Sequence, residues 1–349
     1  MNDHDSAISD RHRFDEERLA AYLATRLPDF RGPLTVRQFQ GGQSNPTYLL
    51  TTPGQRYVMR SKPGPVERLL PSAHAIEREY RVMSALATQG LPVPRMHLLV
   101  EDESVIGRAF YLMEHVEGRI FWNPALPELG TEERGQIYDE MNRVLAALHA
   151  VDPQTAGLTD FGKAGNYFAR QIGRWSRQYV ASETETIEAM NRLIAWLPEH
   201  VPEGDESTVV HGDYRLDNLI FHPTEPRVVA MLDWELSTLG HPLADLSYQC
   251  MAWHIPPGGF RGIGGLDLAA LGIPSEADYI ARYCARTGRT GIAHWDFYLA
   301  YNLFRIAAIL QGVYRRATEG MASSDNALET GKNVRALAEL GWSYAQRAA

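Results

Sequence analysis

The chain has 349 residues, of which 44% are hydrophobic and 22% are charged, and its formal net charge is −9. This composition is typical of a globular protein with one large domain or two medium domains. The negative charge argues against a nucleic-acid partner, because no basic stripe is available to contact a phosphate backbone.

The cysteines and the N-terminal segment indicate in which cellular compartment the protein is expected. Cys250 and Cys284 form no metal-binding or redox motif by their spacing, which favours buried thiols in a reducing environment. Residues 1–13 are polar and lack the apolar core of a signal peptide, and no apolar run is long enough to span a membrane. We therefore expect a cytoplasmic protein with no membrane or nucleic-acid partner.

The first third of the chain predicts a small sheet with helices. Apolar residues recur on one helical face over residues 14–27, so we expect residues 1–30 to form a tail and an amphipathic helix. A second helix is predicted over residues 72–89. Strand patterns occur at residues 34–39, 47–50, 57–60, 93–100 and 109–116. We assign residues 31–116 to a first lobe.

Helical periodicity dominates after Gly130, and we assign residues 117–349 to a second lobe. Helices are predicted over residues 131–149, 166–181, 296–317 and 327–348. The helix over 166–181 carries Arg170, Arg174 and Arg177 at spacings of four and three, so the three side chains share one face. Two interpretations remain open for this face: an ordinary solvated surface, or a clamp for an anionic substrate.

A group of polar residues lies next to two short apolar runs, 209–210 and 228–232, which we predict to be strands in a hairpin-like arrangement. His211, Asp213 and Asn218 would lie on the loop that leaves the first strand, and Asp233 follows the second. Phosphoryl transfer requires such a set. One carboxylate accepts the proton of an attacking hydroxyl, while an amide oxygen and a second carboxylate hold Mg²⁺ on the phosphates.

The spacing within this loop matches that chemistry. Asp213 follows His211 by two residues, and Asn218 follows Asp213 by five, as in the kinase catalytic loop, with Gly212 in place of arginine. We assign Asp213 as the catalytic base and His211 as the residue that holds the loop in place. Arg215 is the third catalytic candidate. Asn218 and Asp233 are the predicted magnesium ligands.

These motifs resemble those of the aminoglycoside phosphotransferase and choline kinase-like small-molecule kinases. Segments 70–80, 166–179 and 233–245 further resemble the branch associated with acyl-CoA dehydrogenases, although we find no flavin-binding signature. The resemblance extends from about residue 34 to the C-terminus. It implies an α+β, bilobal, protein-kinase-like fold, with a small N-lobe antiparallel sheet with a helix and a larger, mainly helical C-lobe.

The resemblance also implies how the first lobe binds ATP. Gly41, Gly42 and Ser44 lie in the turn between the first two predicted strands, where the family has its phosphate loop. Main-chain groups of Glu114 and Val116 would contact the adenine edge, as in the kinase hinge.

A cation on the third predicted strand would hold the α- and β-phosphates. The family usually has lysine there, whereas this chain has Arg60, with Lys62 as the alternative. A glutamate of the following helix would pair with this cation, and we favour Glu79 over Glu77. Beyond the catalytic loop, Asp245 matches a family aspartate that would hold the loop in place.

The implied reaction is transfer of the γ-phosphate of ATP, with Mg²⁺, to a hydroxyl of a small molecule. In this branch the expected acceptor is a hydroxy acid or a hydroxyacyl-CoA, and a functional link to an acyl-CoA dehydrogenase is expected. The net charge of −9 would equally suit a cationic aminoglycoside.

Three other classes of protein share some of these sequence features. A metal-dependent phosphoesterase could use His211, Asp213, Asp233 and His241 and would not need a nucleotide. A pseudokinase would bind ATP without turnover, but the intact catalytic residues argue against it. A protein kinase would need a long activation segment after Asp233, and the Gly-His-Pro run at 240–242 follows too soon for one.

Overall fold

A computed structural model describes residues 5–6, 8–9, 12–39, 45–63, 75–319 and 327–348. The chain divides into two compact units. The first contains Met1–Ile120, Leu219–Glu225 and Val229–Leu236. The second contains Phe121–Asn218, Pro226–Val228 and Ser237–Ala349. The segment that follows the predicted catalytic loop therefore returns to the first unit before the chain completes the second.

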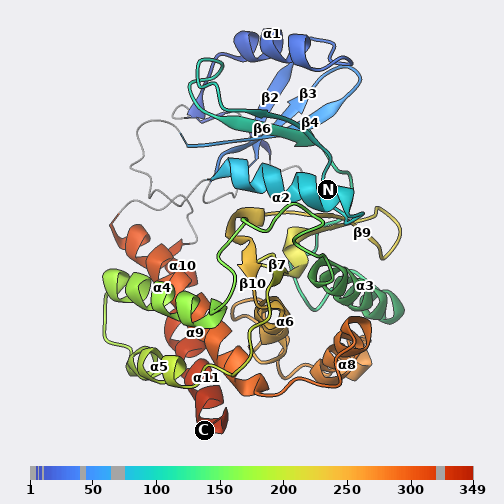
Figure 1. Ribbon diagram of the computed structural model, residues 1–349. Helices are drawn as coiled ribbons and strands as arrows, with labels where there is room; N and C mark the ends of the chain where they lie inside the picture. Colours follow the sequence, from blue (N-terminus) through green and yellow to red (C-terminus); the bar gives the residue numbers. More distant parts are fainter. Residues whose placement is uncertain are drawn as a thin grey trace. The chain divides into compact units, whose positions relative to one another are not determined.

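The first unit is built on an antiparallel sheet in the order β1-β2-β3-β4-β6-β5. The strands are β1 (Asp5–Ser6), β2 (Thr35–Phe39), β3 (Thr47–Thr51), β4 (Arg56–Ser61), β5 (Met96–Val100) and β6 (Phe110–Glu114). Helices α1 (Glu16–Arg26) and α2 (Ile76–Thr88) lie on opposite sides of this sheet (Figure 1). The helix start predicted at residue 72 lies outside the described residues.

Strand β4 supplies side chains to both faces of the sheet, because successive residues of a strand point in opposite directions. Tyr57 and Met59 are buried in the hydrophobic core that also contains Leu19 and Leu23 of α1. Arg60 follows Met59 in the strand, so its side chain points to the opposite face, which α2 covers. Strand β4 therefore places the Arg60 guanidinium on the α2 side of the sheet, while Tyr57 and Met59 hold the strand in the core.

Four short strands flank the predicted catalytic loop in the sequence, and their pairing differs from the expected hairpin. Strand β7 (Thr208–Val210) pairs with β10 (Thr238–Gly240), whereas β8 (Leu219–Phe221) pairs with β9 (Val228–Met231). The predicted pairing of 209–210 with 228–232 was wrong, because residues 219–221 form a strand that lies nearer in sequence to β9. The loop does leave β7, as expected.

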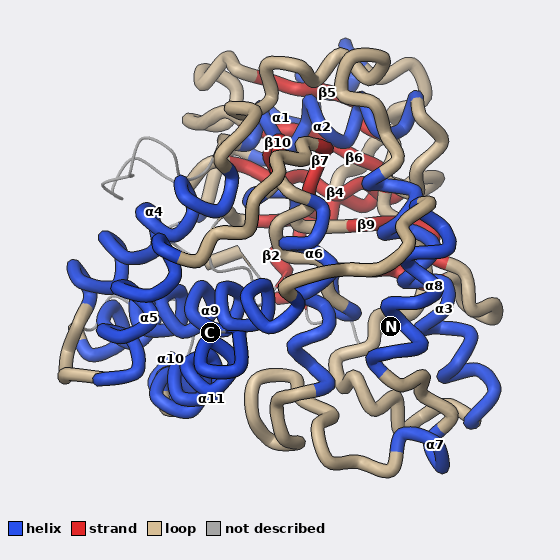
Figure 2. The backbone as a smooth tube through the Cα atoms, turned by 60° about the horizontal axis from the view of Figure 1, so that its bottom comes forward, coloured by secondary structure: helices blue, strands red, loops and turns tan. Residues whose placement is uncertain are grey.

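The second unit is mainly helical. Its helices are α3 (Thr131–His149), α4 (Tyr167–Ser182), α5 (Glu188–Glu199), α6 (Pro242–Cys250), α7 (Leu268–Leu271), α8 (Glu276–Thr287), α9 (Trp295–Thr318), α10 (Ala327–Gly331) and α11 (Asn333–Ala348). Helices α4, α5, α10 and α11 pack around the largely buried α9 (Figure 2). The single helix predicted over 327–348 is interrupted at Lys332, between α10 and α11. The adjacent Gly331 packs so closely against Tyr314 that a Cβ would collide.

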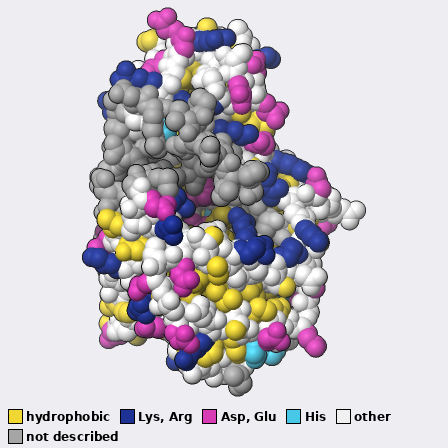
Figure 3. Space-filling view, turned by 90° about the vertical axis from the view of Figure 1, so that its left-hand side faces the viewer, with side chains coloured by type: hydrophobic (Ala, Val, Ile, Leu, Met, Phe, Trp, Pro, Cys, Tyr) yellow, Lys and Arg dark blue, Asp and Glu magenta, His cyan; other side chains and the backbone are white. Residues whose placement is uncertain are grey.

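The surface is of mixed character. On the face shown in Figure 3, basic and acidic side chains are interspersed, and hydrophobic side chains reach the surface in the lower part of the view. Within the described ranges, no helix combines the length and the apolar character needed to cross a bilayer.

Candidate active site

The backbone of the loop after β7 is held by one buried carboxylate. Asp245 of α6 accepts hydrogen bonds from the amides of His211 (2.6 Å) and Gly212 (2.8 Å). Gly212 has φ +83°, a conformation that glycine adopts without strain. Burial opposes ionisation of Asp245, but the hydrogen bond and charge of His149 and the Gly212 amide outweigh it and lower its pKa. Asp245 therefore holds the loop, as the sequence predicted.

The carboxylate of Asp213 is fixed by side chains on both of its oxygens. Tyr248 donates to Oδ1 at 2.6 Å, and Asn218 donates to Oδ2 at 3.0 Å. Arg215 lies 3.2 Å from Oδ2. The side chain of Asp213 remains 14% exposed, so a substrate hydroxyl can reach it. This arrangement suits a general base, which must be oriented and accessible at once.

His211 and Arg215 lie in the same loop but differ in exposure. The His211 ring is fully buried, and its Nδ1 accepts the amide N–H of Asp213 at 3.2 Å. This contact stabilises the turn that presents Asp213. Arg215 is partly exposed and also lies 3.4 Å from Asp217, so it links the base to the neighbouring turn.

Two residues of this site were missed in the sequence. Tyr248 lies three residues after Asp245, so both side chains fall on the face of α6 that contacts the loop. Arg305 of α9 donates to the Gly212 carbonyl and lies 5.1 Å from the Tyr248 ring. The spacing from Asp245 was a weak signal for Tyr248, and no local pattern marks Arg305.

In the first unit, Arg60 is surrounded by carboxylates. Its Nε lies 3.2 Å from Glu79, and its Nη2 lies 3.3 Å from Asp233 and 3.2 Å from Glu235. Burial opposes the charge of Arg60, but these anions outweigh burial and raise its pKa. Tyr111 donates to Glu79 at 3.0 Å. The Arg60–Glu79 ion pair favoured from the sequence is present.

The alternative pair lies at the surface. Lys62 contacts Glu77 at 2.8 Å, and both side chains are substantially exposed. Glu79 is 2% exposed, and burial raises its pKa although Arg60 opposes the shift. The two glutamates of α2 therefore face different environments, and only Glu79 reaches the cation on β4.

The predicted magnesium ligands carry the oxygen donors that Mg²⁺ prefers. Asn218 uses its NH₂ group to contact the Asp213 carbonyl (2.8 Å) and carboxylate, which leaves its amide oxygen for a metal ion. Asp233 uses Oδ1 for Arg60, and its backbone adopts φ +65°, a strained conformation for a residue other than glycine. Each residue therefore fits a role as a magnesium ligand.

The predicted adenine contacts lie where β6 ends. The Glu114 amide donates to the Arg95 carbonyl at 2.9 Å. The Val116 amide has no hydrogen-bond partner within the described part of the chain. Gly118 packs so closely against Phe221 that a Cβ would collide with its carbonyl. Gly41, Gly42 and Ser44 lie outside the described residues.

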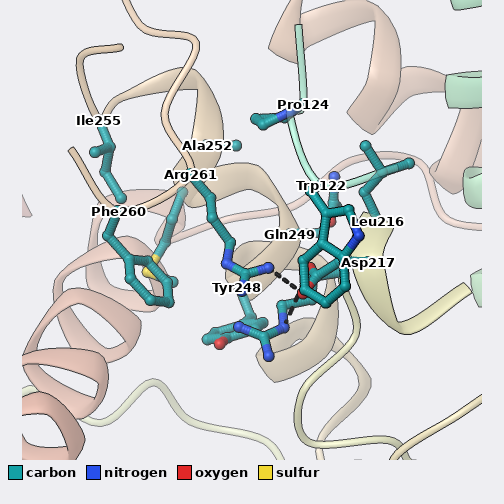
Figure 4. A pocket seen from close by; sticks show the side chains of 12 residues that line it. Trp122, Pro124, Leu216, Asp217, Tyr248, Gln249, Ala252, Ile255, Phe260 and Arg261 are labelled. Carbon is teal, nitrogen blue, oxygen red and sulfur yellow. Dashed lines mark ion pairs between the residues drawn. The ribbon is translucent and has the colours of Figure 1, made fainter. Parts of the chain in front are cut away.

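A pocket in the second unit opens beside Tyr248 and Arg215 (Figure 4). Its apolar walls include Trp122, which is 66% exposed, and Phe260. Asp217 lies in this pocket and forms ion pairs with both Arg215 and Arg261, and Figure 4 shows the Arg261 side chain directed toward Asp217. The pocket therefore combines aromatic surface with two guanidinium groups and one carboxylate that they already neutralise.

The residues of the phosphoesterase alternative do not form a metal-binding group. His241 is the N-cap residue of α6 and accepts the Leu243 amide at 3.2 Å through Nδ1. Burial is the main cause that lowers the pKa of His241 to about 4. Among the residues that the structure describes, no group of three or more His, Cys, Asp or Glu side chains could hold a metal ion.

Comparisons with known proteins agree with this geometry. Residues 35–301 match the model of the phosphotransferase enzyme family. A crystal structure from Ralstonia eutropha JMP134, provisionally assigned as an aminoglycoside phosphotransferase, is 59% identical, with a TM-score of 0.87 over 96% of this chain and 99% of that one. A complex of aminoglycoside phosphotransferase APH(4)-Ia with AMP-PNP and hygromycin B is 15% identical (TM-score 0.59, 93% of this chain and 98% of that one) and supports the fold alone.

Proteins with similar sequences include several that are named acyl-CoA dehydrogenase family members. Acyl-CoA dehydrogenase family member 10 of Mus musculus is 50% identical over 90% of this chain and 30% of that protein. Acyl-CoA dehydrogenase family member 11 of Homo sapiens is 42% identical over 96% of this chain and 44% of that protein. The chain therefore spans less than half the length of these relatives.

The fold is α+β and protein-kinase-like, and together with the catalytic loop it defines a small-molecule kinase. The chain belongs to the phosphotransferase enzyme family. Within that family it falls in the branch whose relatives are named after acyl-CoA dehydrogenases.

Proposed function

We propose that this chain transfers the γ-phosphate of ATP to a hydroxyl group of a small molecule, with Asp213 as the general base. The observation that carries the proposal is the fixed position of the Asp213 carboxylate, held by Tyr248 and Asn218 on a loop that Asp245 anchors. A carboxylate in this setting can accept the proton of the acceptor hydroxyl as the oxygen attacks phosphorus.

The nucleotide is assigned to residues of the first unit. Arg60 would contact the phosphates, which a guanidinium can hold through two parallel hydrogen bonds. Glu114 and Val116 would contact adenine through the main chain, and Gly41, Gly42 and Ser44 would donate to the phosphates.

The metal is assigned to Asn218 and Asp233. Mg²⁺, when bound, would neutralise charge on the phosphates. The support for this assignment is the amide oxygen that Asn218 leaves available and the strained backbone of Asp233.

The acceptor is proposed to be a hydroxy acid or its CoA thioester. The pocket beside Tyr248 supports this class, because Trp122 and Phe260 offer apolar surface to an acyl chain. Its carboxylate, Asp217, is already paired with two arginines, so a cationic aminoglycoside would find no free anion there. The names of the relatives are consistent with acyl chemistry and with a functional link to an acyl-CoA dehydrogenase.

Substitution of the two acidic residues separates chemistry from nucleotide binding. Asp213→Ala is expected to lower turnover by about two to four orders of magnitude, the usual contribution of a general base, while Mg·ATP affinity stays near normal. Asp233→Ala is expected to weaken Mg·ATP binding, measured by calorimetry with and without Mg²⁺. Near-normal turnover of Asp213→Ala would contradict the assigned base, and unchanged Mg·ATP affinity of Asp233→Ala would place the metal elsewhere.

A further inference from the structure

A cluster made only of hydrogen-bond donors lies beside the catalytic loop. Arg174 and Trp175 belong to α4, and Arg305 belongs to α9, which packs against α4. The Arg174 guanidinium lies 5.0 Å from the centre of the Trp175 ring, and that of Arg305 lies 5.7 Å from it. Trp175 is 4% exposed, and its indole Nε1 has no hydrogen-bond partner among the described residues.

Among the residues that the structure describes, no carboxylate forms an ion pair with either guanidinium of this cluster. Arg305 is buried and donates to the Gly212 carbonyl; the charge of Asp213 acts on it, but no described carboxylate forms an ion pair with it. Arg174 forms no hydrogen bond or ion pair with any described residue. By contrast, Arg192 of α5 also lies over a tryptophan, at 5.7 Å from the Trp342 ring, but it pairs with Glu188 at 3.0 Å.

Two guanidinium groups around one tryptophan repel each other, and burying a cation without a partner costs free energy. Partial burial, together with the charge of Arg305, lowers the pKa of Arg174. An anion would remove both costs, because it supplies the opposite charge and accepts hydrogen bonds from guanidinium and indole N–H groups.

We propose that Arg174, Trp175 and Arg305 form an anion-binding subsite that holds the acidic group of the acceptor. This inference rests on the proposed function. It adds to that function the residues that recognise the negative charge of the acceptor. The anion is the carboxylate of a hydroxy acid or a phosphate group of its CoA thioester. Arg174 would supply hydrogen bonds and positive charge to the anion. Arg305, which already donates to the Gly212 carbonyl, would supply positive charge.

The position of Arg305 connects this subsite to the reaction. Arg305 contacts the Gly212 carbonyl and the Tyr248 ring, and Tyr248 donates to Asp213. An acceptor whose anion is bound here is therefore held beside the loop that carries the base. Such anchoring increases the rate of transfer by positioning the hydroxyl.

The first test compares acceptors that share a hydroxyl and differ in charge: 3-hydroxyhexanoate, 3-hydroxyhexanoyl-CoA and hexane-1,3-diol. Arg174→Ala is expected to raise KM for the anionic acceptor by about tenfold or more, the scale of a lost charge-assisted hydrogen bond. KM for ATP and for the diol should not change. Arg192→Ala, the control in which an arginine over a tryptophan is already paired, should leave every KM unchanged. An equal rise in KM for the diol would overturn the subsite.

The second test measures binding without transfer, by calorimetry with hexanoate and hexanoyl-CoA, which lack the hydroxyl. Binding of either anion that weakens at least about tenfold in Arg174→Ala supports the subsite. Weakening with hexanoate identifies the carboxylate as the anion, and weakening with hexanoyl-CoA alone identifies the phosphates. Equal affinities in the two proteins, or no binding of either anion to the wild type, would overturn it. Arg174-dependent binding without any phosphoryl transfer would instead reject the proposed function and retain the subsite.

Discussion

Tyr248 donates a 2.6 Å hydrogen bond to the carboxylate of Asp213 from one face of α6. The same helix carries Asp245, which accepts the two backbone amides of His211 and Gly212. One nine-residue helix therefore fixes both the backbone of the catalytic loop and the carboxylate that we assign as the base.

Tyr248→Phe should lower kcat by about ten- to a hundredfold, because a hydrogen bond to a charged group contributes about 1.5–3 kcal/mol. KM for ATP should not change, because Arg60 and its neighbours do not depend on this hydroxyl. Burial and the Asp213 charge raise the pKa of Tyr248, so the phenol remains a donor at neutral pH. Steady-state kinetics test this, with Tyr344→Phe as the control, since its hydroxyl contacts His254 instead. A wild-type kcat in Tyr248→Phe would show that Asp213 needs no such support.

Glu79→Gln should destabilise the protein much more than Glu77→Gln. Glu79 is buried against Arg60, and breaking a buried ion pair costs about 3 kcal/mol. Glu77 pairs with Lys62 at the surface, where an ion pair contributes less than about 1 kcal/mol. Urea denaturation followed by circular dichroism compares the two substitutions, which lie two residues apart on one helix. Equal losses would mean that the Arg60–Glu79 pair adds nothing beyond a surface contact.

His241 predicts a pH dependence of stability. Burial lowers its pKa in the folded protein to about 4, below the ordinary value of 6.5. As the pH falls from 6.5 to 4, His241 becomes protonated in the unfolded chain but stays neutral in the folded chain. The free energy of unfolding therefore decreases, by at most about 1.4 kcal/mol per pH unit.

His241→Asn should keep the cap, since asparagine can still accept the Leu243 amide, but it removes the titration. The difference in unfolding free energy between the two proteins should therefore shrink as the pH falls towards 4. A difference that stays constant from pH 7 to pH 4 would exclude His241 as the titrating group.

The parts of the site that could be predicted from the sequence are those set by local spacing. His211, Asp213 and Asn218 lie on one loop because Asn218 follows His211 by only seven positions. Arg60 and Glu79 could be paired because the resemblance to kinases implies a strand cation that pairs with a glutamate of the following helix, and the structure shows this ion pair.

The contacts that could not be predicted join distant segments. Arg305 reaches Gly212 from 93 residues further along the chain, through the packing of α9. Likewise, β7 pairs with β10 although an apolar run at 228–231 lies nearer in sequence. The local sequence pattern predicts that a segment is a strand but not which strand it pairs with, because the partner depends on tertiary packing.

Transfer of labelled γ-phosphate tests the central claim most directly. The purified protein would be incubated with Mg²⁺ and [γ-³²P]ATP against hydroxy fatty acids, hydroxyacyl-CoAs, an aminoglycoside and choline. We predict a labelled phosphoester on a hydroxy acid or hydroxyacyl-CoA, and its loss in Asp213→Ala, a variant that still binds Mg·ATP. A wild-type protein that binds Mg·ATP but labels no hydroxyl compound, or an Asp213→Ala protein that labels it equally well, would contradict the account.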